Sequence, residues 1–438
     1  MNEMSLFISE EEEKKRNLVH YEGELGVFDY DPREFRIERL DDFDYLHYHG
    51  SGKSIDLPDG CINTRYMFSY CGLPKGFTLG EHFNTSKVTC MESMFLRCNL
   101  KEGFSLGECF DTSNVTNMEN MFQECVLPRA FSLGEHFDTS NVTDMCCMFE
   151  SCGLPEGFSL GECFDTSRVT DMYGMFEECE LPKDFTLGEH FDTSNVTDMS
   201  DMFSYCSLSY GFSLGEHFTT SNVTSMVGMF YACKLPEGFS LGEHFNTSKV
   251  VDMSSMFGEC KLPKGFSLGK YFDTSNVTDM SYMFAQCTLS GGFSLGEHFD
   301  TSNVAYMCHM FYGCELPKGF SLGEYFNTSN ITSMSDMFYG CELPEGFSLG
   351  EHFAIDRGTD VTRMFDNCKY KGVDAYDYFE TQDAEEIITK LRKYKKSEDI
   401  VVDNELTALM LSVSEELQIS TSAVQRMMKS YLKSLVNK

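Results

Sequence analysis

The stretch FDTSNVTDMSDMFSYC, residues 191–206, decides the fold, because close copies of it run through most of the chain. Its most regular part is MFxxC, which recurs every 27 residues in twelve copies, without an insertion or a deletion. Repeats of about 20–50 residues are typical of arrays in which each unit packs only on its neighbours. The Phe of this motif stands at positions 68, 95, 122, 149, 176, 203, 230, 257, 284, 311, 338 and 365.

The 27-residue period predicts a repeat solenoid of the leucine-rich-repeat type. A propeller blade would need about 40–50 residues and a paired-helix repeat about 33–47, whereas one strand-containing coil fits. In the coil of residues 73–98, the alternation at residues 77–79 predicts a short parallel strand, and β-branched residues predict a second strand at Val88–Met91. Apolar side chains at offsets 0, 3, 4 and 7 from Met91 predict one helical turn, and a single helix across both segments is the alternative.

Three segments follow from where the repeat starts and stops. Residues 1–60 are predicted to form a β-rich cap, because VFDYD and FRIERL within them have the pattern of short strands. Residues 61–370 are predicted to hold the solenoid of about twelve coils. Residues 374–438 lack the period and are predicted to form a small α-helical domain.

The helical C-terminal segment allows two interpretations. Its last part resembles the second half of a helix-turn-helix, which would place four polar side chains against a DNA groove. The other interpretation is a small helical bundle that docks or forms a homo-oligomer. The candidate DNA contacts are Ser422, Gln425, Arg426 and Lys429.

The formal net charge of −35 limits the partners of the solenoid. Direct binding of nucleic acid by this part is disfavoured, because the acidic surface repels a polyanion. A protein partner, basic or DNA-binding, is expected instead. No apolar run approaches the about 20 residues that span a bilayer, and the acidic start lacks an export signal. We therefore expect a cytoplasmic protein without a membrane contact.

Twelve of the nineteen cysteines recur once per coil. Stacked on one another, they are predicted to form a buried column of free thiols, because such thiols pack as small apolar groups. The sequence has no CxxC motif, so we expect no metal in this column. The column is Cys71, Cys98, Cys125, Cys152, Cys179, Cys206, Cys233, Cys260, Cys287, Cys314, Cys341 and Cys368.

A second repeated pair is Glu followed by His, Cys or Tyr, which precedes an isolated Phe in most coils. A row of imidazoles and carboxylates suits metal binding or acid–base chemistry. The pair is uniform along the chain, however, whereas a site is singular. We expect a solvated ladder with no catalytic residue, no metal and no cofactor. Its candidate partner-binding carboxylates are Glu135, Glu189 and Glu243.

The positions around MFxxC that vary between coils are the other candidates for recognition. Repeat proteins commonly bind partners through such a variable face. Tyrosine is enriched at the energetic centres of protein interfaces. The candidate anchors are Tyr205, Tyr231, Tyr312 and Tyr339.

The unit FDTSNVTDMSxMFxxC, present at residues 191–206 and 272–287, resembles the bacterial BspA-like leucine-rich-repeat family over roughly residues 62–368. The resemblance implies a right-handed solenoid and, for many members, a surface protein that binds host proteins or other cells. It implies no catalytic residues. Because the sequence shows no export signal, anchor or sorting tail, we expect an intracellular scaffold from a bacterium, a phage or a mobile element.

Two functions are consistent with these features. The first is a non-enzymatic scaffold that binds a partner protein through the acidic solenoid. The second is a regulator or anti-defence factor that acts around nucleic acid. In that case the acidic solenoid mimics DNA, or the helical C-terminal segment contacts DNA.

Overall fold

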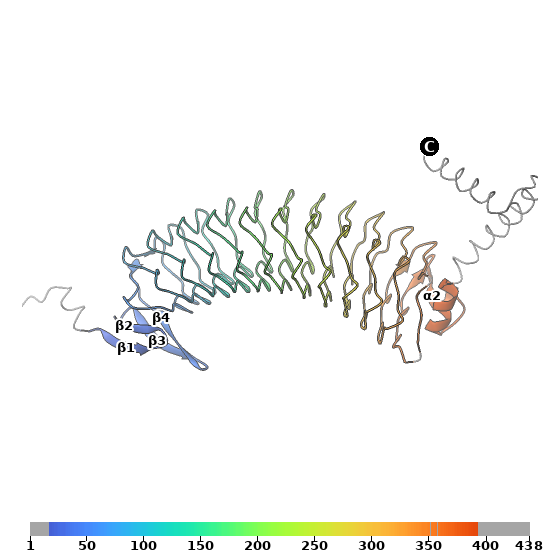
Figure 1. Ribbon diagram of the computed structural model, residues 1–438, viewed down its shortest axis with the longest axis horizontal. Helices are drawn as coiled ribbons and strands as arrows, with labels where there is room; N and C mark the ends of the chain where they lie inside the picture. The colour runs from blue at the N-terminus through green and yellow to red at the C-terminus, as the bar shows by residue number, and fades with distance from the viewer. Residues whose placement is uncertain (1–16, 351, 357, 393–438) are drawn as a thin grey trace, which may run out of the picture.

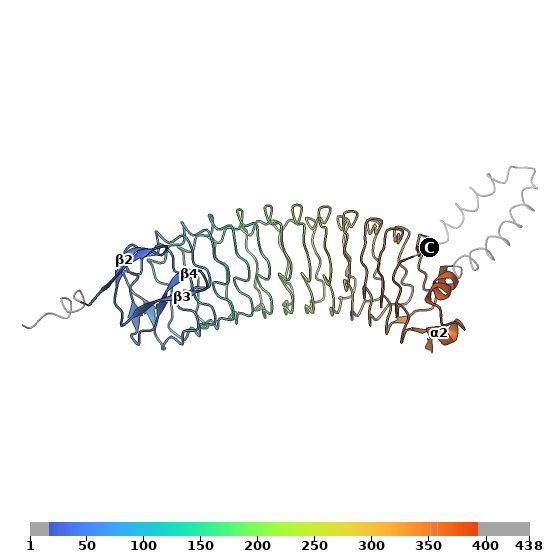
Figure 2. The ribbon, with the colours of Figure 1, turned by 90° about the horizontal axis from the view of Figure 1, so that it is seen from below.

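The computed structural model describes residues 17–350, 352–356 and 358–392. The repeats form coils that stack side by side into an arch, with β-hairpins at one end and helix α2 at the other (Figures 1 and 2). Successive coils are joined by parallel bridges between residues 27 positions apart, such as Cys90 to Asn117 and Asn117 to Asp144. The tandem repeat of the sequence is thus a repeat fold in three dimensions.

Two antiparallel hairpins cover the N-terminal end of the stack. Strand β1 (Val19–Gly23) pairs with β2 (Gly26–Tyr30), and β3 (Phe35–Leu40) pairs with β4 (Phe43–Tyr48). Strands β2 and β3 lie where VFDYD and FRIERL predicted them. Alternating side chains of these strands are buried against the first coil, because one face of each hairpin meets the core. The buried set includes Phe28, Phe35, Leu46 and Tyr48.

The parallel strands of the coils are shorter than the sequence predicted. Strand β5 (Ser54–Ile55) pairs with β6 (Thr78–Leu79), and each has only two residues. The second strand expected at Val88–Met91 is reduced to one bridge residue, Cys90. The β-branched residues are present, but the chain turns directly after Met91, so the ladder between coils cannot extend there.

The helical turn predicted in each coil is wrong, and so is the alternative of a single helix. The segment from Met91 to Cys98 is a run of tight turns. Within the coil, the N–H of Met94 donates to the carbonyl of Met91 at 3.2 Å, and Cys98 closes a similar turn onto Phe95 at 2.9 Å. Ser93 lies between them with a left-handed φ of 53°. An α-helix has right-handed residues throughout, so this position excludes one.

The remaining N–H groups of this segment bind the next coil instead. Ser93 donates to Glu119 O at 2.8 Å, and Phe95 donates to Met121 O at 2.9 Å. Every second donor is thus used between coils, whereas an α-helix uses every donor within itself. Apolar offsets of 0, 3, 4 and 7 fit stacked turns as well as a helix, and the sequence pattern does not separate the two.

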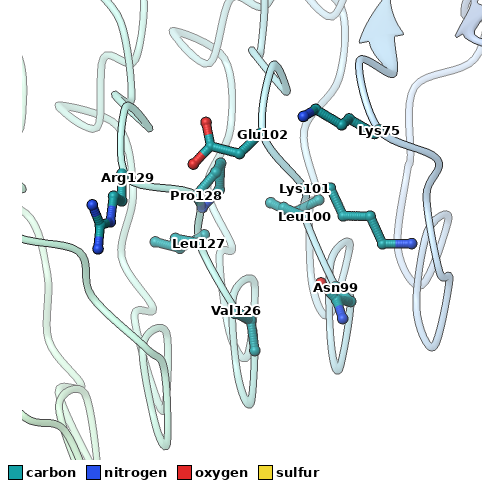
Figure 3. A pocket seen from close by; sticks show the side chains of 9 residues that line it. All are labelled: Lys75, Asn99, Leu100, Lys101, Glu102, Val126, Leu127, Pro128 and Arg129. Atoms are coloured by element: carbon teal, nitrogen blue, oxygen red, sulfur yellow. The ribbon is translucent and has the colours of Figure 1, made fainter.

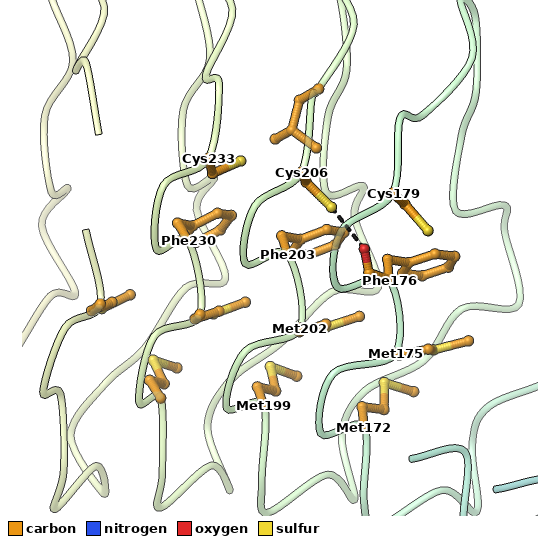
Figure 4. Close-up of a cluster of buried hydrophobic side chains, with 14 of the residues drawn as sticks. Met172, Met175, Phe176, Cys179, Met199, Met202, Phe203, Cys206, Phe230 and Cys233 are labelled. Atoms are coloured by element: carbon orange, nitrogen blue, oxygen red, sulfur yellow. Dashed lines mark hydrogen bonds between the residues drawn. The ribbon is translucent and has the colours of Figure 1, made fainter. Parts of the chain in front are cut away.

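The interior consists of columns of identical side chains (Figure 4). The ring of Phe203 stacks between those of Phe176 and Phe230, at centroid distances of 5.9 and 5.7 Å. Its neighbours Met199 and Met202 are fully buried in the same layer. No single coil could bury these side chains alone, so each coil depends on its neighbours for its core.

The thiols next to these rings are free and mostly buried. All nineteen cysteines are unpaired. The Cys206 thiol donates to the carbonyl of Phe176 at 2.8 Å, as the dashed line in Figure 4 shows. Burial raises the pKa of Cys125 to about 12. The predicted column of free thiols is confirmed for the residues listed above, of which Cys71 alone is only partly buried.

We predict that a thiol reagent separates two classes of cysteine in the native protein. The thiolate is the reactive species, so the buried thiols with raised pKa should react slowly at pH 8. Cys109 and Cys163 are exposed and should react first. Mass spectrometry of peptides after brief alkylation checks this. Modification of Cys206 or Cys233 as fast as Cys109 would contradict the packing.

The arch bends toward the side that carries the turns. The rings of Phe110 and Phe137, on another side of the coils, are 6.4 Å apart, whereas Phe122 and Phe149 beside the turns are 5.7 Å apart. Successive coils are nearly identical, so equivalent rings report the displacement from coil to coil at that point. The shorter displacement lies on the concave side, and the turn-to-turn hydrogen bonds hold it there.

The C-terminal end of the stack is closed by a different set of elements. Strand β7 (Glu342–Leu343) pairs in parallel with β8 (Lys369–Tyr370), and β8 pairs antiparallel with β9 (Val373–Asp374). Helix α2 (Ala375–Tyr378) follows, and residues 384–392 are also helical. Their apolar side chains cover the last coil, and the buried ones are Ala375, Phe379, Ile387, Ile388 and Leu391.

The DNA-contact interpretation of the C-terminal segment is not tested by these elements. The candidate DNA contacts Ser422, Gln425, Arg426 and Lys429 lie outside the described residues. In the part of the chain that the structure describes, no helix is both long enough and apolar enough to cross a membrane.

Candidate interaction surface

The concave side of the arch carries four variable positions per coil, most of them exposed or half-buried, and we call it the inner face. In one coil these positions are residues 92, 93, 96 and 97, and their equivalents follow at intervals of 27. The backbone of the turns is fixed by hydrogen bonds, and the Met and Phe between these positions point inward. The four side chains can therefore differ from coil to coil without a change of fold.

Carboxylates gather in the middle of the inner face. Glu150, Glu177, Glu178 and Asp201 occupy neighbouring coils, and we call them the central acidic cluster. Burial, followed by the charges of Asp201, Glu150 and Glu178, raises the pKa of Glu177 from 4.5 to about 7. Burial and the charge of nearby Asp198 raise the pKa of Asp201 as well.

Polar side chains donate hydrogen bonds to two of these carboxylates but do not neutralise their charge. Gln123 Nε2 donates to Glu150 Oε2 at 2.7 Å, and Ser151 Oγ donates to Glu178 Oε2 at 2.8 Å. Within the described residues, none of the four carboxylates forms an ion pair with Lys, Arg or His. Carboxylates that raise the pKa of one another and have no cationic partner favour a cation from elsewhere.

Two of the predicted anchors lie together beside the cluster. The rings of Tyr205 and Tyr231 meet edge to face, with centroids 5.3 Å apart and an interplanar angle of 77°. Tyr231 Oη donates to Glu259 Oε1 at 2.6 Å, which orients its ring and raises the pKa of Tyr231 in addition to the effect of burial. Tyr205 is 52% exposed. An aromatic pair that faces solvent next to carboxylates is suited to a cationic side chain.

The other two predicted anchors form a second pair further along the same face. Tyr312 and Tyr339 stack in parallel, with centroids 5.0 Å apart and an interplanar angle of 5°. The residues that follow them are Gly313 and Gly340, both with left-handed φ. Without side chains at those positions, the edge of the stacked rings stays uncovered. Asn367 Nδ2 donates to Tyr339 Oη at 2.6 Å and fixes the outer ring.

A polar row next to the second pair was not predicted. The ring of His309 stacks on that of Tyr282 at 4.4 Å, and its Nε2 lies 3.5 Å from Asp336 Oδ2. Arg363 Nη2 pairs with the same oxygen at 3.0 Å. Burial lowers the pKa of His309, and the charge of Asp336 opposes this effect. These four residues stand 27 positions apart in the sequence, and this spacing could have predicted that they lie in one row. They are Tyr282, His309, Asp336 and Arg363.

The predicted glutamates lie elsewhere. Glu135, Glu189 and Glu243 are exposed and follow the Leu-Gly corner of every second coil. Among the described residues, no hydrogen bond, ion pair or ring contact joins their side chains to the four tyrosines. In the same part of the chain, no group of three or more His, Cys, Asp or Glu side chains has the geometry of a metal site.

Comparison with known proteins identifies the repeat. The family model described as "Mycoplasma protein of unknown function, DUF285" matches six overlapping segments of the chain. No curated protein and no solved structure matches. The matched segments are residues 62–155, 130–240, 157–264, 209–289, 240–342 and 292–400.

Proposed function

The chain belongs to the DUF285 family, and we propose that it is a non-enzymatic scaffold whose inner face binds a basic segment of a partner protein. The observation that carries the proposal is the central acidic cluster beside the Tyr205–Tyr231 pair. Its carboxylates lack a cationic partner within the described chain. The ring of Tyr205 faces solvent, and that of Tyr231 is half-buried beside it. Lysine and arginine side chains provide both the charge and the cation–π contact that this arrangement lacks.

The rest of the molecule supports this proposal by its uniformity. The core columns repeat almost unchanged, because each position must pack against its own equivalent in the next coil. The inner face combines a backbone fixed by hydrogen bonds between coils with side chains that differ from coil to coil. A binding surface needs that combination, whereas a structural ladder needs identical residues.

We also propose a closer classification and a location. The 27-residue coils with parallel bridges fit a solenoid of the leucine-rich-repeat type, and the FDTSNVTDM unit fits the BspA-like group. The protein acts in the cytoplasm, on a partner that is basic or itself binds DNA. Neither an active site nor a cofactor is part of this proposal.

The proposal predicts that Y205A/Y231A weakens binding of a basic segment. The probe is a fluorescent hexalysine peptide, titrated against the full chain and followed by anisotropy. Loss of both rings is expected to cost about 2 kcal/mol, or roughly thirtyfold in Kd. The matched control is Y271A/Y325A, because these tyrosines are 47% and 54% exposed in the Glu-His column. Equal losses in both variants, or no binding to the wild type, would refute the inner-face site.

A pull-down with the full chain then identifies the natural partner. We expect basic proteins that are retained by the wild type and lost by Y205A/Y231A. Recovery of nucleases or other DNA-binding proteins that dissociate in high salt would favour the DNA-mimic version of the function. Recovery of acidic proteins alone would contradict the proposed partner chemistry.

A further inference from the structure

A cationic hollow lies on another side of the first coils. It has a volume of about 390 Å³ and is open to solvent. Lys75, Lys101 and Arg129 stand around it, while Val126 and the buried Leu127 contribute apolar surface (Figure 3). The three cations are exposed, and within the described residues none of them forms an ion pair. In a chain of net charge −35, unpaired cations around an apolar surface form a local exception.

Lys101 marks the hollow as a departure from the repeat. Eight other coils have proline at the equivalent position, and the Lys101 N–H is not used in a backbone hydrogen bond between coils. Proline would therefore fit the backbone here too, so the fold does not require the lysine. The eight prolines are Pro74, Pro128, Pro155, Pro182, Pro236, Pro263, Pro317 and Pro344.

Val126 is the second departure from the repeat. It is 55% exposed, and it is the only apolar residue in its column. The exposed apolar surface of this valine is unfavourable in water, and its burial against another apolar group would lower the free energy. The equivalents in the other coils are Gly72, Asn99, Gly153, Glu180, Ser207, Lys234, Lys261, Thr288, Glu315, Glu342 and Lys369.

Glu102 shows how the charges of the hollow are arranged. It lies between Lys75 and Arg129 in Figure 3, in a column where basic and acidic residues alternate in the first coils. This alternation keeps like charges off adjacent coils, which is a structural reason for Lys75 and Arg129 to be basic. Lys101 stands outside that column and raises the formal charge of the lining from +1, for Lys75, Glu102 and Arg129, to +2.

We propose that the hollow docks an acidic segment of a partner protein, with an apolar side chain of that segment on Val126 and its carboxylates on Lys101 and Arg129. The positive charge selects an acidic occupant, and the exposed valine selects one that also carries an apolar group. This site shares no residue with the inner face, so it is independent of the proposed function. A partner with a basic and an acidic segment could use both.

Three peptides test the two parts of this chemistry. The probe is fluorescent EELFEE, compared with KKLFKK, which reverses the charge, and EEGSEE, which removes the apolar side chains. Anisotropy with the full chain at low salt should show the strongest binding for EELFEE, and added salt should weaken it. Equal binding of KKLFKK, or no measurable binding of EELFEE, would overturn the proposal.

A variant that restores the repeat locates the binding. K101P/V126S/R129G introduces residues that other coils carry at these positions and places no new carboxylate beside Glu102, so we expect the fold to be kept, as circular dichroism and the thermal midpoint will show. The Kd for EELFEE should rise about tenfold or more. The matched control K261S/K264E changes the same columns five coils further on and should bind like the wild type. An equal loss in both variants would place the binding outside the hollow.

The same variants separate this inference from the proposed function. K101P/V126S/R129G should keep hexalysine binding, because the inner face is untouched. Y205A/Y231A should keep EELFEE binding for the corresponding reason. If both probes fail with either variant, they bind one common surface, and the hollow is not a separate site.

Discussion

Replacing Phe203 by alanine is expected to lower the free energy of unfolding by about 3–5 kcal/mol. The side chain is fully buried, stacks on a ring in each neighbouring coil and meets Phe212 edge to face at 5.9 Å. Alanine leaves a cavity that a column of stacked coils cannot close, because each backbone is held by its neighbours. Urea unfolding followed by far-UV circular dichroism measures the loss.

The position of Phe203 near the middle of the array should also change how the protein unfolds. Coils interact only with their neighbours, so a weak central coil separates two halves that then unfold at different urea concentrations. Tyrosine fluorescence is a suitable second probe, because the chain has no tryptophan. The control is Y210A in the same coil, which is 83% exposed and should change stability by less than about 0.5 kcal/mol. A single transition at the wild-type midpoint for F203A would contradict the stacking.

Glu177→Gln is expected to stabilise the protein above pH 7 and to have little effect near pH 4. The folded protein holds a proton on Glu177 with a pKa of about 7, whereas the ordinary value is 4.5. A raised pKa contributes stability that is complete below pH 4.5 and is lost as pH rises through 7. The wild type therefore carries a repelled carboxylate at pH 8, which glutamine removes.

The size of this effect is limited by solvent. The shift of Glu177 corresponds at most to about 3 kcal/mol. The side chain is partly exposed, so screening reduces the expected gain at pH 8 to about 1 kcal/mol. Urea midpoints at pH 5, 6, 7 and 8 measure it, with E189Q as the control on an exposed carboxylate outside the cluster. If E177Q gave the same gain at pH 5 as at pH 8, the repulsion would not be its cause.

The core could be read from the sequence because stacking copies each position into every coil. Phe203 and Cys206 recur at intervals of 27 residues, because each of these side chains packs on its equivalent in the next coil. The local backbone could not be read in the same way. Stacked turns and a helix bury the same offsets, and the difference lies in hydrogen bonds to a neighbouring coil that one repeat does not contain.

The inner face could be predicted only in part. Tyr205 and Tyr231 stand out as variable aromatic residues, but their pairing depends on two adjacent positions of neighbouring coils that lie close together. His309 and Asp336 are 27 residues apart and look unrelated until the coils are stacked. Variation at a repeated position indicates that its side chain can change without disturbing the fold. The stacking of the coils then determines which of these side chains contact one another.

The displacement between successive coils decreases from the outer to the inner side of the arch, and the number of coils sets the length of the inner face. Each coil extends the inner face by one step, which is 5.0 Å between the rings of Tyr312 and Tyr339. Gain or loss of one 27-residue unit would lengthen or shorten the surface that contacts a partner by that step, and the structure of every other coil would stay the same. A chain of this kind adjusts its reach in whole units, by duplication and deletion, rather than by remodelling a pocket.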